Sequence, residues 1–290
     1  MFERRAYLLD VTRRVPTMRT LQELVDILAR YRYNEFRPFA ERDFPAELDF
    51  GKLGAYCEMQ GVEMVKTTRN EFEDLFIRAE YAIVSTESER SLAGRAEDMR
   101  EQMIHAEAKG RARKTKGFLV TDFADECVWQ PLCISLPGII MGGNFASGGA
   151  KSSMMDLEKE LDRVMEAPLG GLLLRLGTLY LRGGAPHDHV SELFNILSHD
   201  VGYSRHPGLT QFVLDDISGV AHGVRLAAER WVDRSDWAKE IVYAANLLDC
   251  ACHRRNEAML RELRDEHGHV WRLRFQPEGR VESLAKLPRF

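Results

Sequence analysis

Several polar residues follow the short apolar runs in the first half of the chain, at the points where predicted strands end. They are Asp10, Arg13, Glu41, Asn70, Glu87, Asp122 and Asp125. If these strands run parallel, their carboxyl ends share one edge of a sheet. Binding and catalytic groups of parallel α/β folds gather at that edge. We therefore expect the candidate site among these residues, with Arg13, Glu41, Asp122 and Asp125 in one cleft.

The other chemical motifs of the chain are weaker. Cys250-x-Cys252-His253 supplies three groups, but a structural zinc site needs four ligands, and His187-Asp188-His189 lies too far away to assign. We interpret the two cysteines as small buried helix residues. The Gly-Gly pairs at 142–143 and 148–149 lack the context of a phosphate-binding loop. We expect neither a metal nor a cofactor.

Composition restricts the class of protein. The chain has 290 residues, of which 44% are hydrophobic and 29% charged, so it can bury a core and make about two domains. The net charge is −5, and the short basic run from 111 to 116 is typical of a solvated helix end, so we expect no nucleic-acid partner. No run reaches the ~20 apolar residues of a membrane span, and five cysteines indicate no disulfide framework. We expect a cytoplasmic protein with no membrane segment.

Strand-like and helix-like segments alternate in the first half, which predicts a parallel α/β sheet. The predicted strands are Ala6–Val11, Asn34–Phe39, Val62–Thr67, Tyr81–Thr86 and Gly117–Phe123. Helical patterns cover Thr20–Tyr31, Phe50–Gln60 and Ser91–Lys109. After the small-residue stretch Ala146–Ser153 the pattern is helical, so we place a sheet domain in residues 1–150 and a helical domain in residues 151–290.

Motifs in a shared order resemble glycoside hydrolase family 20, the β-N-acetylhexosaminidases. Leu9–Met18 (LDVTRRVPTM) resembles the start of the family's barrel, and Tyr33–Phe44 resembles its second strand. Ser91–Arg95 and Gly117–Pro131 (GFLVTDFADECVWQP) resemble the segments around its seventh and eighth strands. Glu266–Trp271 resembles the close of the helical domain in bacterial members. The resemblance implies a partial TIM-barrel-like sheet followed by a helical domain.

The resemblance also implies roles for single residues. Arg13 would bind sugar hydroxyls, because its planar fork matches paired oxygens. Glu41, Asp122 and Asp125 would line the same pocket and bind the sugar, and Trp129 could form its floor.

Each of these residues also has a structural interpretation. Arg13 can form an ion pair with Asp10 or Asp122, and Glu41 can form a salt bridge with Arg42 or Arg37. Trp129 can be a buried loop anchor.

The chain departs from the family where catalysis takes place. The family's catalytic Asp-Glu pair ends its fourth strand in a His-x-Gly-x-Asp-Glu motif, and no such motif stands between Val65 and Tyr81. The adjacent acids Asp125-Glu126 resemble that pair in type but follow the eighth strand; as an alternative, they cap a turn and face solvent. Phe123, Glu126 and Glu89-Arg90 replace the Trp, Asn and Trp-Asn of the family's pocket. The resemblance therefore implies a barrel without strands four to six.

Loss of these strands leaves the seventh, eighth, first, second and third as one contiguous five-stranded sheet. The linker Arg69–Ala79 can form a helix of about 15 Å, roughly one strand length, which makes the return crossover feasible. Five parallel strands are too few to close a barrel, for which about eight are needed. The sheet would therefore keep open edges, and we expect a homo-oligomer that covers them.

Three functions remain open. The first is a catalytically impaired relative of the β-N-acetylhexosaminidases, a pseudoenzyme that still binds N-acetylhexosamine. The second is an active glycosidase in which Asp125 and Glu126 are relocated catalytic acids. The third is a non-enzymatic scaffold in which the helical half carries the interaction.

Overall fold

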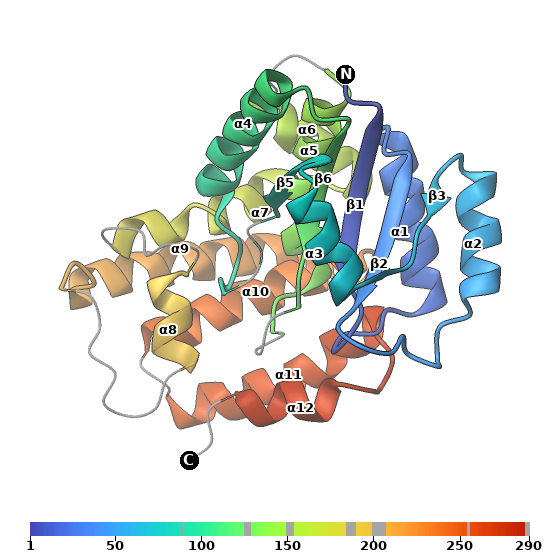
Figure 1. The fold of residues 1–290 in the computed structure, drawn as a ribbon. Helices are drawn as coiled ribbons and strands as arrows, with labels where there is room; N and C mark the ends of the chain where they lie inside the picture. Colours follow the sequence, from blue (N-terminus) through green and yellow to red (C-terminus); the bar gives the residue numbers. More distant parts are fainter. Residues whose placement is uncertain are drawn as a thin grey trace.

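Six strands form one parallel sheet in the computed structural model, which describes residues 1–86, 88, 90–124, 129–148, 154–183, 190–198, 207–253 and 256–287 (Figure 1). The strands are β1 (Arg4–Asp10), β2 (Glu35–Ala40), β3 (Glu63–Met64), β4 (Thr67–Thr68), β5 (Tyr81–Ser85) and β6 (Gly117–Asp122). Their order is β3-β2-β1-β6-β5, and β4 also pairs with β2. The predicted parallel α/β sheet and its strand order are confirmed. The predicted strand Val62–Thr67 is divided into the two short strands β3 and β4.

The strand register brings the ends of the central strands together. In the β1–β6 pair, Leu9 lies opposite Asp122, and in the β1–β2 pair Asp10 lies opposite Phe39. Asp10 and Asp122 are the last residues of their strands. Because all strands are parallel, the loops that carry the candidate residues all leave from the carboxyl ends of the strands.

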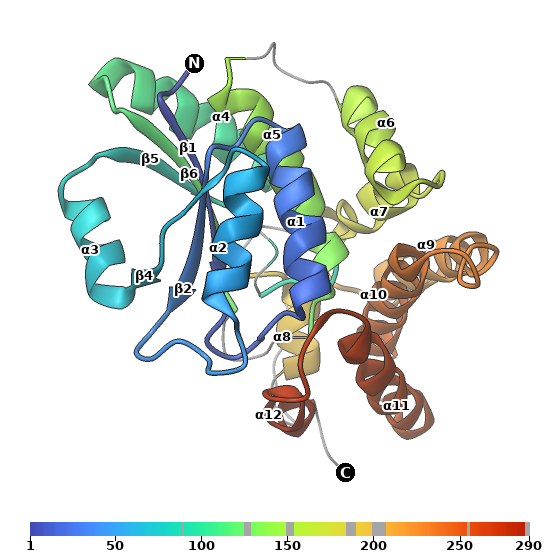
Figure 2. The ribbon, with the colours of Figure 1, turned by 90° about the vertical axis from the view of Figure 1, so that its right-hand side faces the viewer.

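Four helices cover one face of the sheet: α1 (Met18–Arg30), α2 (Phe50–Met59), α4 (Ala96–Arg113) and α5 (Leu136–Ala146) (Figure 2). Strand side chains alternate between faces, so Tyr7 and Leu9 point towards these helices and join the main core with Phe118 and Val120. Helix α5 packs very closely, because a Cβ on Gly142 would lie 2.3 Å from Val120.

Helix α3 (Arg69–Ile77) covers the opposite face, which we call the inner face (Figure 2). Ala6, Leu8 and Leu119 face it from the strands, and Phe72 and Leu75 of α3 pack against them. The chain leaves β4 at one edge of the sheet and returns at β5, the opposite edge. The crossovers from β1 to β2 and from β5 to β6 step towards β3, whereas the crossover through α3 steps in the opposite direction. Crossovers between parallel strands are right-handed, so α3 lies on the opposite face of the sheet from the other crossover helices.

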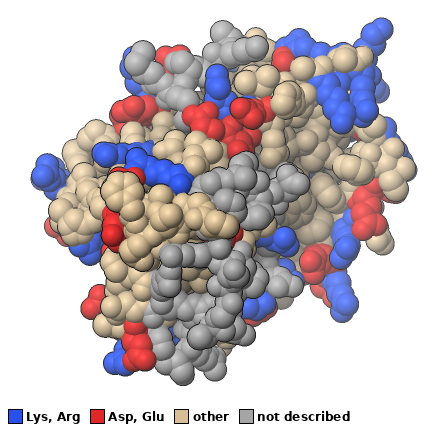
Figure 3. Space-filling view, turned by 90° about the vertical axis from the view of Figure 1, so that its left-hand side faces the viewer, with Lys and Arg blue, Asp and Glu red and all other residues tan. Residues whose placement is uncertain are grey.

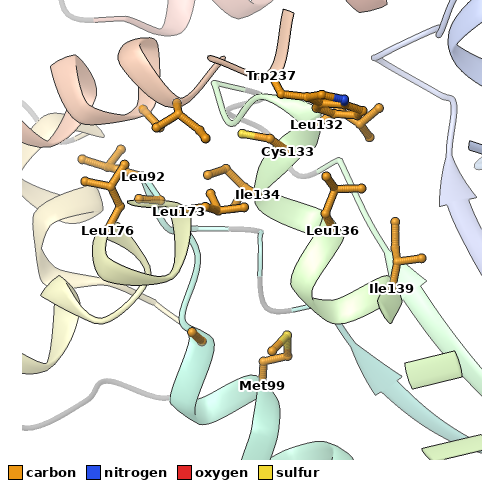
Figure 4. Packing of buried hydrophobic residues seen from close by; sticks show 14 of the residues in the cluster. Leu92, Met99, Leu132, Cys133, Ile134, Leu136, Ile139, Leu173, Leu176 and Trp237 are labelled. Atoms are coloured by element: carbon orange, nitrogen blue, oxygen red, sulfur yellow. The ribbon is translucent and has the colours of Figure 1, made fainter. Parts of the chain in front are cut away.

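The described residues after 153 form helices α6 (Met154–Met165), α7 (Gly170–Leu176), α8 (Glu192–Ser198), α9 (Gln211–Glu229), α10 (Asp236–Cys252), α11 (Glu257–Arg274) and α12 (Arg280–Lys286). Two short 3-10 helices span Leu132–Ser135 and Leu179–Gly183. One hydrophobic cluster contains residues of both halves, and Figure 4 shows Ile134 beside Leu173 and Leu92 beside Leu176. The predicted boundary near residue 150 lies outside the described residues.

The surface and the helices carry two further features. Basic and acidic side chains are interspersed over much of the face in Figure 3, with a basic group at its upper right.

Among the described residues, no single helix has both the length and the apolar character to cross a membrane. Asp156–Met165 and Gly170–Arg182 reach that length and apolar character only together, as a pair bent by 117°.

Candidate functional site at the strand ends

Asp122, at the end of β6, is a fully buried hydrogen-bond acceptor. Its carboxylate accepts hydrogen bonds from the hydroxyls of Tyr7, at 2.7 Å, and Ser88, at 2.9 Å. Burial, and then the adjacent carboxylate, raises the pKa of Tyr7 well above its usual value. Asp122 therefore joins β1, β6 and the segment after β5. Its contacts are structural, although the sequence interpretation also allowed a role in sugar binding.

Asp10, at the end of β1, is also buried and connects two loops. One carboxylate oxygen accepts the backbone N–H of Thr12 at 2.8 Å, and the other accepts that of Ala124 at 3.1 Å. Burial raises the pKa of Asp10, and these hydrogen bonds oppose the rise. The two aspartates at the centre of the sheet thus hold the strand-end loops in place.

Arg13 follows β1 and is partly exposed between two acids. Its guanidinium lies 4.0 Å from the carboxylates of both Glu41 and Glu282, and it donates to the carbonyl of Ala124 at 3.3 Å. The predicted alternative partners, Asp10 and Asp122, are instead engaged with hydroxyl and backbone groups. Both acids beside Arg13 are substantially exposed.

A close backbone approach brings helix α12 to Arg13. Gly279 precedes α12 with φ +78°, and a Cβ there would lie 1.9 Å from the carbonyl oxygen of Arg13. Only glycine fits both the conformation and the space. This contact places Glu282 beside Arg13, and sequence reasoning missed it because 269 positions separate the two residues.

Glu41 follows β2 and lies beside Arg13 as predicted. Its backbone N–H donates to the Thr12 hydroxyl at 3.1 Å. The alternative partner Arg37 is buried on the inner face and binds Glu35, so the proposed Glu41–Arg37 salt bridge is wrong.

Trp129 is an anchor between the halves of the molecule. The side chain is 1% exposed, its indole N–H donates to the carbonyl of Ser283 at 3.2 Å, and its ring lies 5.5 Å from that of Phe194. This burial favours the loop-anchor interpretation over the pocket floor. The residues Asp125 and Glu126 lie outside the described part of the chain. They are bracketed by Ala124, which contacts Arg13, and by Trp129.

Three aromatic side chains meet at the strand-end side of the inner face. The ring centroid of Phe123 lies 5.3 Å from the centroids of both Phe39 and Phe72, and the centroids of Phe39 and Phe72 are 5.9 Å apart. All three pairs have edge-to-face geometry. Such pairs stabilise beyond their buried area. This aromatic trio fills the space above the sheet with apolar side chains. Phe72 belongs to the predicted linker helix. The sequence shows that this aromatic residue is present, but only the crossover of the chain brings it to the strands.

Buried polar groups lie beneath the trio. Arg37 pairs with Glu35 and donates to the Thr67 hydroxyl at 3.0 Å, and the Tyr81 hydroxyl donates to Glu35 at 3.0 Å. Burial, and then the charge of Glu35, raises the pKa of Tyr81. The alternation of Glu35 and Arg37 in a buried strand is a signal that sequence reasoning did not use. The group is satisfied internally, as buried charges must be.

Metal ligands do not converge in the described part of the chain, where no group of three His, Cys, Asp or Glu residues is arranged to hold an ion. Cys250 and Cys252 are buried in α10, as predicted for small helix residues. Comparison with models of protein families gives no match, and comparison with curated proteins gives none either.

Proposed function

We propose that this chain is a non-hydrolytic relative of the β-N-acetylhexosaminidases of glycoside hydrolase family 20. Its sheet would be a partial TIM barrel that keeps strands seven, eight, one, two and three. The order β5-β6-β1-β2-β3 supports this proposal, because it is the order these strands have around a barrel. The position of α1, α2, α4 and α5 on one face, where barrel helices lie, supports it further.

The observation that carries the non-hydrolytic proposal is the aromatic trio with α3. A barrel enzyme needs an open space above the inner face for its substrate, and here Phe39, Phe72 and Phe123 fill that space. Asp10 and Asp122, at the ends of β1 and β6, are engaged as well, since both carboxylates accept internal hydrogen bonds. General acid catalysis is worth about 10² to 10⁴-fold, and orientation of the acetamido nucleophile contributes a further large factor. Without a general acid and without an oriented acetamido group, we expect no turnover of an N-acetylhexosaminide.

Binding of a sugar has weaker requirements than catalysis. Arg13 offers a guanidinium that is held only loosely, at 4.0 Å from Glu41 and Glu282. A pyranose presents neighbouring hydroxyls that can bridge a guanidinium and a carboxylate. We therefore place a shallow N-acetylhexosamine contact at Arg13 and Glu41, at the rim of the sheet.

Hydrolysis is tested with aryl N-acetylglucosaminide and N-acetylgalactosaminide, using purified wild type and the Asp125→Ala, Glu126→Ala double variant. The expected result is no turnover above the buffer rate for either protein. Turnover by the wild type that the double variant abolishes would contradict the proposal and identify Asp125-Glu126 as relocated catalytic acids.

Binding is tested separately by saturation-transfer NMR with N-acetylglucosamine. The expected result is a transfer signal with wild type that Arg13→Ala loses. Arg261→Ala, an exposed arginine on α11, serves as the control and should keep the signal. Equal signals from all three proteins would exclude Arg13 as the contact. No signal from wild type would favour the interaction scaffold.

We also propose a cytoplasmic location. Cys57, Cys133, Cys250 and Cys252 are buried thiols, which suits a reducing compartment. Burial raises the pKa of Cys57 to about 11, so this thiol stays protonated and unreactive near neutral pH.

A further inference from the structure

A groove lies beside β5, the strand at one edge of the sheet, between the C-terminal parts of α3 and α4. Its volume is about 210 Å³. Small-molecule sites usually enclose about 300 to 1,000 Å³, so this groove suits one or two side chains of a longer ligand. None of Arg13, Glu41, Asp122 or Trp129 is among the lining residues. The groove is therefore distinct from the proposed sugar contact.

Strand β5 presents main-chain hydrogen-bonding groups to this groove. The carbonyl of Glu80 and the N–H of Thr86 both bond to β6, at 3.0 and 2.9 Å. Main-chain groups alternate in direction along a strand, so the even-numbered residues point towards β6, whereas Tyr81 and Ile83 point outwards. Among the described residues, no group hydrogen-bonds the outward N–H and C=O of these two residues, which also line the groove. Such an edge is a template for another strand.

The opposite edge of the sheet is protected against pairing, whereas β5 is not. Strands β3 and β4 have two residues each, and Lys66 lies between them; short strands and lysines keep an edge from pairing. Strand β5 pairs with β6 over five consecutive residues, and its sequence, YAIVS, contains no charge and no proline. Phe76, which lines the groove, and the next residue, Ile77, are 70% and 78% exposed. Exposed apolar side chains beside an open edge indicate a binding surface.

The two walls of the groove differ in chemistry. Helix α4 contributes Lys109 and Arg113, and no acidic residue is among the described residues that line the groove. Neither basic side chain has an ion-pair partner in the described part of the chain, and Glu107, the closest acid to them along α4, is paired with Arg111. The wall from α3 presents the apolar ring of Phe76. An occupant therefore needs acidic groups on one side and apolar groups on the other.

We propose that the β5 edge binds an extended peptide in which acidic and apolar residues alternate. The peptide adds a strand to the sheet, and its main chain hydrogen-bonds Tyr81 and Ile83. Successive side chains of a strand point to opposite faces, so the acidic ones meet Lys109 and Arg113 while the apolar ones pack on Phe76. A second copy of this chain can cover the same edge, but it brings a second basic rim against the first. An acidic peptide should therefore displace it.

Fluorescence anisotropy tests the proposal with a labelled peptide of sequence Gly-Glu-Val-Glu-Val-Glu-Val-Gly. One control peptide has lysine in place of each glutamate, and another has the same composition in two blocks, Gly-Glu-Glu-Glu-Val-Val-Val-Gly. We expect saturable binding of the alternating acidic peptide, about tenfold tighter than that of either control and weaker as the ionic strength rises. Light scattering in excess peptide should give the mass of a monomer with bound peptide. Absence of saturable binding, or equal binding of the lysine peptide, would overturn the proposal, and a dimer that persists in excess peptide would assign the edge to a second copy.

Variants then locate the binding. Ile83→Pro removes an outward N–H that the sheet does not use, and it should weaken binding about tenfold; edge strands tolerate proline, and circular dichroism checks the fold. The double variant Lys109→Gln, Arg113→Gln changes only exposed side chains and should also weaken binding about tenfold, because each exposed ion pair contributes a factor of about two to five. The matched control Lys159→Gln, Arg261→Gln removes the same charges from α6 and α11 and should bind as wild type does. Equal affinity of the double variant and its control would place the peptide elsewhere and refute the site.

Discussion

Replacement of His267 by glutamine should remove a pH dependence from the free energy of unfolding. His267 lies in α11 and is 3% exposed. Its Nδ1 lies 2.7 Å from the Tyr243 hydroxyl, and its Nε2 lies 3.1 Å from the Ser283 hydroxyl. Burial, with the charges of Arg264 and Arg280, lowers its pKa from 6.5 to about 4. The imidazole is therefore neutral in the folded protein at neutral pH.

The sign of the effect follows from proton uptake. Between pH 6.5 and pH 4 the unfolded state binds a proton at His267 and the folded state does not, so stability falls as the pH falls. The contribution is fully present above pH 6.5. With these pKa values, linkage gives a loss of about 2 kcal/mol at pH 5 and about 3 kcal/mol at pH 4, as order-of-magnitude estimates.

Urea unfolding followed by circular dichroism at pH 8, 7, 6 and 5 measures this effect. Burial raises the pKa of other acids, among them Glu240, and their protonation also contributes to the pH dependence, so the difference between wild type and His267→Gln isolates the histidine. At pH 8 the variant should be less stable, because it loses hydrogen bonds, and this deficit should shrink by about 2 kcal/mol at pH 5. His222→Gln, on the exposed surface of α9, controls for loss of an imidazole. A deficit that is constant with pH would refute the reasoning.

Two further predictions concern packing and assembly. Gly142→Ala should lower stability by about 2 kcal/mol in urea unfolding, since the new Cβ would lie 2.3 Å from Val120 and 2.6 Å from the Tyr33 hydroxyl. Gly219→Ala, in a helix with open space around it, should instead stabilise by about 0.5–1 kcal/mol; equal effects of the two changes would contradict the packing argument. The exposed edges of the sheet and the exposed Phe76 and Ile77 on α3 should be covered in a homodimer. Light scattering at high micromolar concentration should give twice 33.2 kDa, and a monodisperse monomer would exclude the dimer.

The strands and the helices that pack on them could be predicted from local patterns. Apolar runs that end in polar residues located β1, β2, β5 and β6, and the length of the 69–79 linker allowed for helix α3. The order of strands was predicted from the family resemblance, because removal of strands four to six from a circular barrel leaves the other five as one contiguous sheet, and the observed order agrees with it. The division of the third strand at Val65 could not be predicted, since it depends on which residues of β2 are available for pairing.

The candidate site was predictable only in part. Arg13 and Glu41 follow neighbouring strands, so their proximity follows from a parallel sheet. The contacts of Asp122 with Tyr7 and Ser88, which turn a possible ligand into a buried acceptor, depend on side-chain packing between β1, β6 and the segment after β5. Hydropathy patterns hold no information about such partners.

The sequence by itself determined the alternation of elements, the parallel sheet and the helical character of the second half, because these depend on local periodicity and chain connectivity. Tertiary structure alone decided three other features. Gly279 brings α12 to Arg13, the crossover seats Phe72 on Phe39 and Phe123, and α10 meets Arg274 of α11 at an open cleft. Each joins residues distant in the chain. Their meeting depends on the packing of whole helices, which no local pattern specifies.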